Sequence, residues 1–372
     1  MIFSILKENL SPALVKAQSV LERKSTRPIL ENILLEAFEG NLCISSTDLR
    51  VSIRQNVNCS IEKPGSVAIP GRKFNEIVRE MPTGNIHFEL KDNGWVVVSS
   101  GKSVFHIPGV VADEYPALPF SPEQFLSVEA SVFRTMLDKT LFATSTDESR
   151  PHLCGVYVKT VIDEDANQIM RMVATDGHRL SLSEQVVKGE VIPFETGLIL
   201  PKKGLSELRS LIDSCESTFE LASGSGMVFV RFSNTLLMIT LIEGKFPNYQ
   251  QVIPQEMDKK LFINKDFLVD ALRRVSLLSD QETHTVVMDA SKVETVLSSA
   301  NSQFGDAREE LESEFDGEPF KVAFNSVYLL EAVRTLVGKR VSFSIGDALA
   351  PCLLRGSDDP QHLCVVMPMR LD

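Results

Sequence analysis

A strand followed by a helix occurs three times along this chain, and this repeat constrains the fold more than any other feature. The clearest copy covers residues 197–213. There Leu198–Leu200 predicts a short buried strand, and Pro201 suits a helix start because proline has no N–H group to leave unpaired. After Pro201, leucines recur at helical spacing, and basic and polar residues fall on the opposite side. The pattern predicts a helix with an apolar back and a basic front.

The two other copies lie at near-equal spacing on either side. In the first copy, residues 67–79, Pro70 stands at the start of the helix. In the third copy, residues 322–334, Asn325 or Ser326 takes the place of proline as the helix starter. Three copies at near-equal spacing are typical of a repeat architecture.

A second helical pattern and a strand–turn pattern repeat together with the first. The helical pattern covers residues 7–20, 130–141 and 264–275. Alternating strand segments end in the pairs Thr47-Asp48, Thr175-Asp176 and Ala300-Asn301. A chain of 372 residues is too long for one core, and connectors rich in proline separate the copies. We therefore predict an α+β fold of three repeated domains, residues 1–122, 123–254 and 255–372, each with two helices backed by antiparallel sheets.

The charge of the chain limits how it could bind nucleic acid. Its net charge of −12 argues against a conventional DNA-binding protein, which carries a basic surface. A DNA role would have to confine the positive charge to one face, such as the basic fronts of the repeated helices. No signal peptide or membrane-spanning run is apparent, and the six cysteines lack metal-ligand spacing. We expect a cytoplasmic protein with reduced thiols, no metal and no cofactor.

One segment offers groups that could catalyse hydrolysis. Asp176 and His178 are two residues apart, and Ser181 and Ser183 follow them. The first repeat, however, has Thr-Asp-Leu-Arg at this place and no histidine, and a Thr-Asp pair beside Gly177 is ordinary turn chemistry. We do not expect an enzyme, and a hydrolase that uses Asp176 and His178 stays an alternative that would need a pocket with a nearby nucleophile.

The C-terminal tail, Cys364–Asp372, is unusually apolar for a terminus. It can be a last core strand, but Pro368 interrupts strand pairing and leaves Met369 and Leu371 beyond it. Methionines suit adaptable binding surfaces. The tail is therefore also a candidate wall of a groove for partner peptides.

Sequence motifs along the whole chain match those of a known family. They include Pro70-Gly-Arg-Lys-Phe, Val173-Ala-Thr-Asp-Gly-His-Arg-Leu, Leu200-Pro-Lys-Lys-Gly, Gly244-Lys-Phe-Pro-Asn-Tyr and Val365-Val-Met-Pro-Met-Arg-Leu. On these motifs the chain resembles the bacterial sliding clamps, the β subunits of DNA polymerase III. The resemblance implies a non-catalytic processivity factor whose protomer forms half of a closed ring, a head-to-tail homodimer with its helices facing duplex DNA. It also implies loading by a clamp loader, association with the nucleoid, and capture of replicative and repair polymerases through short peptides.

The resemblance implies three sets of site residues. The DNA-facing set is Lys24, Arg27, Arg72, Lys73, Arg79, Lys202, Lys203 and Arg209. The set that lines the partner-peptide cleft is Leu153, Thr175, Gly177, His178, Arg179, Leu180, Pro247, Val252, Asn325, Tyr328, Val365, Val366, Met367, Pro368, Met369, Arg370 and Leu371. The dimer set is Lys73, Lys102, Phe105 and Ile107 on one protomer against Leu277, Leu278, Asp306 and Glu310 on the other. The chain departs from the family at Asp372, which adds one acidic residue to the usual terminus. A monomeric three-domain adaptor without a DNA role stays a second alternative.

Overall fold

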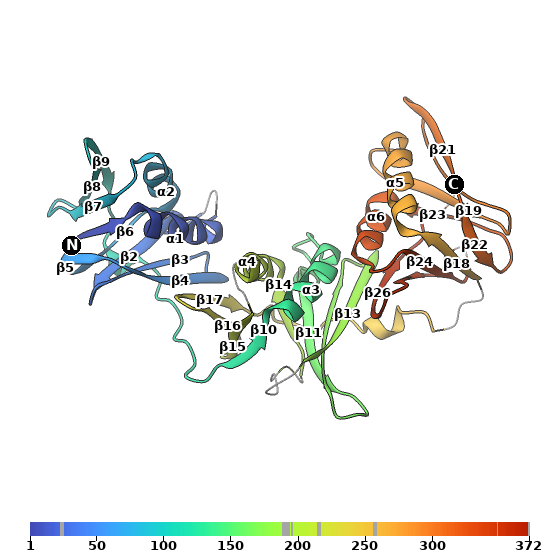
Figure 1. Ribbon diagram of the computed structural model, residues 1–372, viewed down its shortest axis with the longest axis horizontal. Coiled ribbons are helices and arrows are strands. Elements are labelled where there is room, and N and C mark those ends of the chain that lie inside the picture. The colour runs from blue at the N-terminus through green and yellow to red at the C-terminus, as the bar shows by residue number, and fades with distance from the viewer. Residues whose placement is uncertain are drawn as a thin grey trace. The chain divides into compact units, whose positions relative to one another are not determined.

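The computed structural model describes residues 1–22, 26–187, 194, 196–213, 217–255, 259–347 and 349–370. They form two compact units (Figure 1). Unit 1 combines Met1–Ala130 with Lys203–Leu241, and unit 2 combines Ser131–Lys202 with Ile242–Asp372. Each unit thus joins one terminal third of the chain to part of the central third. The domain boundaries near 122 and 254 stay a prediction.

The helices lie where the repeats predict them. In the described residues they are α1 (Lys7–Val20), α2 (Gly71–Glu80), α3 (Ala130–Thr140), α4 (Lys202–Asp213), α5 (Lys265–Val275) and α6 (Ser326–Thr335). Asn325 is the residue that starts α6, because its side chain accepts hydrogen bonds from the N–H groups of Val327 and Tyr328. The prediction of two helices in each repeat is confirmed.

Unit 1 contains two antiparallel sheets. The first has the order β5-β1-β7-β8-β9, and the second has the order β10-β15-β16-β17-β4-β3-β2-β6. Their strands are β1 (Ile2–Leu6), β2 (Asn32–Phe38), β3 (Asn41–Thr47), β4 (Val51–Asn58), β5 (Ser60–Lys63), β6 (Gly65–Pro70), β7 (Asn85–Leu90), β8 (Trp95–Ser100), β9 (Ser103–Pro108), β10 (Leu126–Glu129), β15 (Thr218–Gly224), β16 (Met227–Phe232) and β17 (Thr235–Thr240). The larger sheet contains strands from both segments of the unit, because β17 pairs with β4.

Unit 2 is built in the same way. Its sheets have the orders β14-β11-β12-β13-β26-β25-β24-β18-β22 and β21-β20-β19-β23. Their strands are β11 (Gly155–Ile162), β12 (Gln168–Thr175), β13 (Arg179–Val187), β14 (Leu198–Pro201), β18 (Lys259–Asn264), β19 (Thr285–Ala290), β20 (Thr295–Asn301), β21 (Gly305–Leu311), β22 (Ser313–Asp316), β23 (Phe320–Asn325), β24 (Arg340–Ile345), β25 (Cys352–Gly356) and β26 (Asp359–Val366). Here β13 pairs with β26 and joins the two segments.

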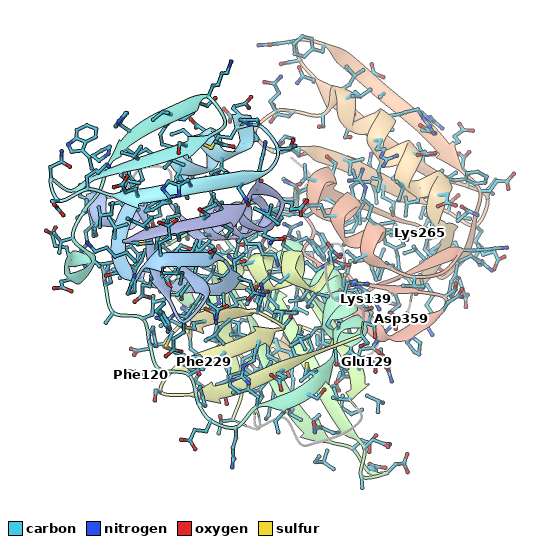
Figure 2. The ribbon with its side chains drawn as sticks, turned by 60° about the vertical axis from the view of Figure 1, so that its left-hand side comes forward. Phe120, Glu129, Lys139, Phe229, Lys265 and Asp359 are labelled. Atoms are coloured by element: carbon cyan, nitrogen blue, oxygen red, sulfur yellow. The ribbon has the colours of Figure 1, made fainter. Side chains whose placement is uncertain are left out.

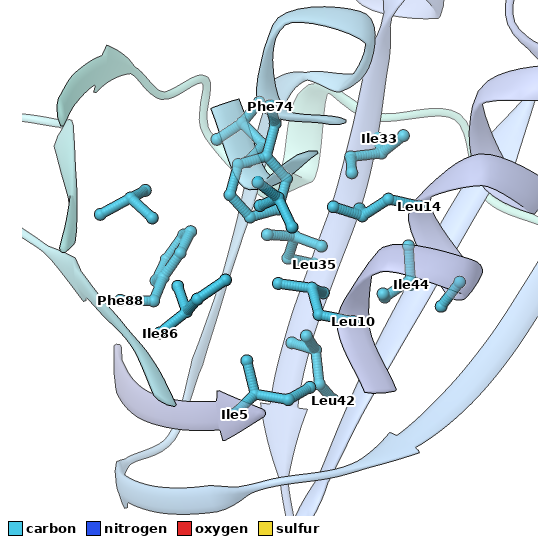
Figure 3. Close-up of a cluster of buried hydrophobic side chains, with 14 of the residues drawn as sticks. Ile5, Leu10, Leu14, Ile33, Leu35, Leu42, Ile44, Phe74, Ile86 and Phe88 are labelled. Atoms are coloured by element: carbon cyan, nitrogen blue, oxygen red, sulfur yellow. The ribbon is translucent and has the colours of Figure 1, made fainter. Parts of the chain in front are cut away.

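The apolar helix faces pack against the sheets to form the cores. In unit 1, Leu10 and Leu14 of α1 and Phe74 of α2 lie in one buried cluster with side chains of the surrounding strands (Figure 3). Within this cluster the Phe88 ring stacks on Phe3 at 4.6 Å and meets Phe74 edge-on at 6.1 Å. Each such side chain contributes roughly 1.5–3 kcal/mol through burial. The basic helix fronts are thereby left facing away from the core.

The same side-chain oxygen closes the strand–turn segment of every repeat. Asp48 Oδ1 accepts hydrogen bonds from the N–H groups two and three residues ahead, at 2.8 and 2.7 Å. Asp176 does the same at 2.9 and 3.0 Å, and Asn301 at 2.9 and 3.3 Å. The residue after the carboxylate has a positive φ in the first two turns, 74° at Leu49 and 94° at Gly177. The three repeats therefore share not only their helices and strands but also this pair of hydrogen bonds.

The strand after each of the first two turns pairs with the last strand of a hairpin. In unit 1 the Thr240 N–H donates to the Arg50 carbonyl at 2.8 Å, and in unit 2 the Met367 N–H donates to the His178 carbonyl at 2.8 Å. Arg50 and His178 stand at the same position, two residues after the turn aspartate. Each of these two turns therefore lies at an equivalent junction, where two strands that are far apart in sequence pair: β4 with β17 in unit 1, and β13 with β26 in unit 2.

A lysine at the start of one helix caps the end of its neighbour in both terminal thirds. Lys7 Nζ donates to the carbonyls of Arg79 and Met81 at 2.8 and 2.5 Å, where α2 ends. Lys265 Nζ (Figure 2) donates in the same way to the carbonyls at the end of α6, at 3.2 and 2.5 Å. A positive charge at this end of a helix is favourable because the last carbonyls point toward it. The central third has Ala130 at the corresponding position.

A buried polar cluster joins β26 to its neighbours in unit 2. His362 is 1% exposed, and its Nδ1 lies 3.0 Å from the Leu182 carbonyl, which can only accept a hydrogen bond. Its Nε2 lies 3.1 Å from Thr335 Oγ1. Asp359 of the same strand forms a buried ion pair with Lys139 of α3 (Figure 2). Burial lowers the pKa of His362 to about 4, although the hydrogen bond to Leu182 acts in the opposite direction.

Replacing Lys265 with methionine is expected to destabilise the protein by about 1–3 kcal/mol, because it removes a charge-assisted cap and leaves helix carbonyls unpaired. Urea denaturation measures this change in the free energy of unfolding. Lys260→Met is the control, since Lys260 is an exposed lysine on the adjacent strand β18. Equal stability of the two variants would show that the cap has no energetic role.

The buried histidine predicts a specific pH dependence of stability. The unfolded chain takes up a proton near the ordinary histidine pKa of 6.5, whereas folded His362 stays neutral down to about 4. Protons therefore favour the unfolded state, and the free energy of unfolding should fall as the pH drops through this window. Urea titrations of His362→Gln should show a weaker fall than the wild type, and the exposed His106→Gln should follow the wild type. A His362→Gln curve parallel to that of the wild type would contradict this assignment.

Candidate functional site

The predicted DNA-facing residues lie mainly on helices of unit 1, and we call this set the basic helix face. Its described members are Arg27, Arg72, Lys73, Arg79, Lys202, Lys203 and Arg209; Lys24 lies outside the described residues. Side-chain hydrogen bonds link the helices, because Asn75 Nδ2 donates to Gln18 Oε1 at 2.6 Å and Ser19 Oγ donates to Glu207. Helices α1, α2 and α4 are therefore held as one surface of unit 1.

Two of these cations pair with acids on their own helix. Lys73 pairs with Glu76, and Arg79 Nε lies 3.2 Å from Glu80 Oε1. Both pairs are well exposed to solvent. Exposed pairs of this kind contribute little to stability, because water screens the two charges. A phosphate group could therefore replace the carboxylates at little energetic cost.

Lys203 has a different environment from the other cations. Its Nζ pairs with the carboxylate of Asp48, whose side chain is 5% exposed, and donates to the Val20 carbonyl at 2.8 Å. Arg72 is also engaged, since its Nη2 donates to the Leu21 carbonyl at 2.6 Å. These contacts join α4 and α2 to the end of α1 and to the first turn. Lys203 therefore has a structural task that its place in the basic pattern did not reveal.

The predicted peptide-cleft residues lie in unit 2, and we call this set the tail cluster. Strand β26 carries Val365 and Val366 into register with Leu180 and Arg179 of β13. Strand β26 ends at Val366, before Pro368, and the Met369 N–H then donates to the Ala323 carbonyl at 2.8 Å. The chain beyond the proline is thus attached to β23 rather than left without contacts.

The predicted cleft residues divide into a buried and an accessible group. The buried group is Leu153, Arg179, Leu180, Val365 and Val366, of which Leu180 is only 2% exposed. The group with more than slight exposure is Thr175, Gly177, His178, Pro247, Val252, Asn325, Tyr328, Met367, Pro368, Met369 and Arg370, and Leu371 lies outside the described residues. Only the second group is accessible enough to meet a partner directly.

Arg179 is the most highly connected side chain of the tail cluster. Its Nε lies 3.0 Å from Asp176 Oδ2, its Nη2 donates to the Phe142 carbonyl at 2.7 Å, and its Nη1 pairs with Glu331. Its guanidinium also lies 4.5 Å from the ring centroid of Tyr328. Sequence reasoning missed Phe142 and Glu331 as neighbours of the site. Glu331 stands three residues after Tyr328, a spacing that places both on one side of α6 and could have indicated it.

The contacts of Asp176 do not support the hydrolase alternative. Its carboxylate accepts hydrogen bonds from the backbone N–H groups of His178 and Arg179 and from Arg179 Nε. In the described part of the chain no hydrogen bond joins it to the His178 ring, which instead stacks on Tyr328 with centroids 6.1 Å apart. Asp176 closes the turn, as the Thr-Asp sequence predicts, and the His178 ring is exposed beside it.

The predicted dimer residues occupy strand and helix ends in both units. Phe105 and Ile107 lie on β9, the last strand of its sheet, and Lys102 is in the turn before it. Leu277 is 80% exposed in the short helix η6 (Ser276–Leu278). Asp306 and Glu310 are exposed on β21, again the last strand of its sheet; Leu278 is half-buried and Ile107 is buried. Lys73, which also belongs to the predicted dimer set, lies on α2, and the other accessible members lie at or beside edge strands.

The described residues contain neither a metal site nor a membrane-spanning helix. Within them no group of three or more histidine, cysteine, aspartate or glutamate side chains is placed to hold a metal ion. None of the helices seen there combines the length and the apolar composition needed to cross a membrane.

Comparison with known proteins identifies the family. Residues 1–119, 127–248 and 250–370 match the N-terminal, central and C-terminal domains of the DNA polymerase III beta subunit. The Beta sliding clamp of Caulobacter vibrioides is 34% identical over 371 residues, which cover 99% of each chain. The crystal structure of the DNA polymerase sliding clamp from Caulobacter crescentus covers 100% of both chains with a TM-score of 0.93 and 35% identity. That of the clamp from Bacillus subtilis has a TM-score of 0.92 at 27% identity, again over 100% of both chains. The chain belongs to the bacterial sliding clamps, the β subunits of DNA polymerase III.

Proposed function

We propose that the protein works as a homodimeric ring that encircles duplex DNA without reading its sequence and tethers polymerases to it. As a sliding clamp it is a DNA replication protein and a non-catalytic processivity factor. The observation that carries the ring concerns two strands without a partner on one side. Among the described strands, β21, which follows the third turn, and β9, the last hairpin strand of the first repeat, both stand at the edge of a sheet. The ring would act in the cytoplasm, at the nucleoid, with domains at residues 1–122, 123–254 and 255–372.

The repeats supply a rule for the dimer contact. The strands after the first and second turns, β4 and β13, pair with the hairpin strands β17 and β26. The strand after the third turn, β21, has a neighbour on one side only among the described strands, and so does β9, the matching hairpin strand of the first repeat. Edge strands expose unpaired N–H and C=O groups that can pair with another chain. The rule supports pairing of β21 in one protomer with β9 in the other.

The rule also supplies a register. In unit 1, Val51 stands opposite Ile239. Ile107 has the position of Ile239 in its hairpin, and Gly305 has the cross-strand position of Val51 in the third repeat. Gly305 would therefore stand opposite Ile107 of the second copy. This arrangement brings the exposed Phe105 toward β21 and its acidic residues toward Lys102, which is complementary in charge.

Replacing Leu277 and Leu278 together with alanine is expected to give a folded monomer, because apolar anchors at the centre of an interface dominate its energy. Light scattering at decreasing concentration gives the mass, which should fall from twice 41.3 kDa to 41.3 kDa. Val293→Ala is the control, since Val293 is equally exposed but lies in the turn between β19 and β20. A double variant that stays dimeric would exclude this interface. A wild-type protein that is monomeric throughout would favour the adaptor alternative.

The basic helix face supports contact with the phosphates of encircled DNA. Its lysines and arginines are concentrated on helices, whereas the whole chain carries a net charge of −12. Contacts to phosphate carry no sequence information, which suits a ring that slides. Acidic surface elsewhere would repel DNA from the outside of the ring. A clamp loader would be needed to open the ring around circular DNA, and retention on circular but not linear DNA after loading tests the whole proposal.

Neutralising Lys202, Lys203 and Arg209 with glutamine is expected to weaken DNA association and flatten its salt dependence. Each lost phosphate contact changes the log–log slope by roughly 0.9. Fluorescence anisotropy across a salt series measures the slope. Lys203→Gln alone should lower stability, through loss of the Asp48 contact, and change the slope less than the triple variant. An unchanged slope in the triple variant would argue against these residues as DNA contacts.

The tail cluster is the surface we propose for partner peptides. Its accessible residues combine apolar groups, such as Val252 and Met367, with polar groups, such as His178 and Asn325. Leu180 and Val365 of the same set lie together in a buried cluster of unit 2. Family partners, among them the clamp loader and the polymerases, carry short segments with a glutamine and bulky apolar residues. Such residues could each contribute roughly 1.5–3 kcal/mol through burial, less the cost of ordering the peptide.

Truncation after Met367 is expected to weaken peptide binding by roughly tenfold or more, because it removes the apolar chain end. The truncated protein keeps strand β26 and the hydrogen bond from Met367 to His178. Leu180→Ala is a poorer variant, since Leu180 is a core residue. Isothermal titration with a synthetic peptide measures the affinity, and light scattering should show an intact dimer. The groove hypothesis fails if the wild type binds the peptide and the truncated protein binds it equally well.

A further inference from the structure

Arg179 of the tail cluster joins three parts of unit 2. Its guanidinium bonds to Asp176 in the turn, to the Phe142 carbonyl in the short helix η3 (Leu141–Ala143), and to Glu331 on α6. Its side chain is 9% exposed. Each of its three nitrogens therefore already has a partner inside the protein. A direct hydrogen bond from Arg179 to a peptide would have to displace one of these partners.

The neighbours that Arg179 positions are two aromatic rings. Its guanidinium lies 4.5 Å from the Tyr328 ring centroid, within cation–π distance. The His178 ring lies 6.1 Å from the same Tyr328 ring, nearly parallel to it at 20°. His178 is exposed and Tyr328 is half-buried, so both can meet a partner. The place of the guanidinium thus determines where these two rings stand.

Glu331 is the member of this network that can be changed without disturbing the fold. Asp176 also closes the turn through two backbone N–H groups, so replacing it would alter the turn itself. The Glu331 side chain is 39% exposed. If it is neutralised, Arg179 keeps its ion pair with Asp176, and no buried charge is left without compensation.

We propose that Glu331 is a positioning residue of the peptide site: acting through Arg179, it holds the Tyr328 and His178 rings in the orientation that a partner peptide meets. This inference rests on the proposed peptide-binding function of the tail cluster. Side chains that are already held in their bound orientation reduce the ordering cost of association, and their release lowers affinity without removing any direct contact.

The first arm of the test needs no peptide. In Glu331→Gln the NMR resonances of the His178 ring should shift, because the stacked Tyr328 ring changes its local field when it moves. Asp270→Asn is the matched control: Asp270 is an acidic helix residue of unit 2 that pairs with Arg273 at 3.3 Å, but it lies on α5. Unmoved His178 resonances in Glu331→Gln would overturn the proposal. If Glu331→Gln does not fold, Glu331→Asp, which keeps the charge at a shorter reach, gives the same readout.

The second arm measures the affinity for a fluorescent synthetic peptide with one glutamine and two leucines. Glu331→Gln should bind it roughly three- to thirtyfold more weakly than the wild type, and Asp270→Asn should bind it as the wild type does. In a Tyr328→Leu background, Glu331→Gln should have little further effect, because both changes act on one ring. Additive losses would overturn the proposal. A wild-type protein that does not bind the peptide would refute the proposed peptide function, while the first arm would still decide whether Glu331 positions the rings.

Discussion

The structure depends on one local interaction, in which the side-chain oxygen of an aspartate or asparagine accepts two backbone hydrogen bonds and closes the turn after a strand. Asp48, Asp176 and Asn301 each make it. In the first two repeats it fixes the first residues of the next strand, and these residues receive a hairpin strand from a distant part of the chain. Such long-range pairing needs a fixed register, because a shift by one residue would turn every side chain to the other face. The turn supplies that register.

The same turns serve different tasks in the two units. In unit 1, Oδ2 of Asp48 pairs with Lys203, which also donates a hydrogen bond to the carbonyl of Val20 at the end of α1. In unit 2, Oδ2 of Asp176 accepts a hydrogen bond from Arg179. Arg179 also pairs with Glu331 of α6 and lies against the rings of Phe142 and Tyr328. The same kind of turn therefore attaches α4 to the end of α1 in unit 1, and it holds Arg179 beside aromatic side chains in unit 2. The chemical difference lies in a single cation and its neighbours.

Much of the fold could be predicted from the sequence, because the repeats are local patterns. The helices follow from apolar spacing, and Asn325 starts α6 because its side chain can bond to the N–H groups that follow. The roles of Lys203 and Arg179 could not be predicted in this way. Both look like surface cations in the sequence, and only the folded chain shows the acids that meet them. Leu180 and Leu153 likewise read as possible lining residues, whereas the structure buries them, since burial depends on strands that are remote in sequence. Spacing thus predicts elements better than it predicts which side chains stay accessible.

The pairing of β17 with β4 and of β26 with β13 has a consequence for the central third of the chain. Each of its two parts completes a sheet that begins in a terminal third. Excised alone, the central third would expose β17 on one part and β13 on the other, two strands with apolar residues and unpaired backbone groups. Such edges promote association between chains. The central third reads as one of three equivalent domains in the sequence, yet it depends on both other thirds to cover its strands, and gene fragments that end at its borders would favour aggregation over folding.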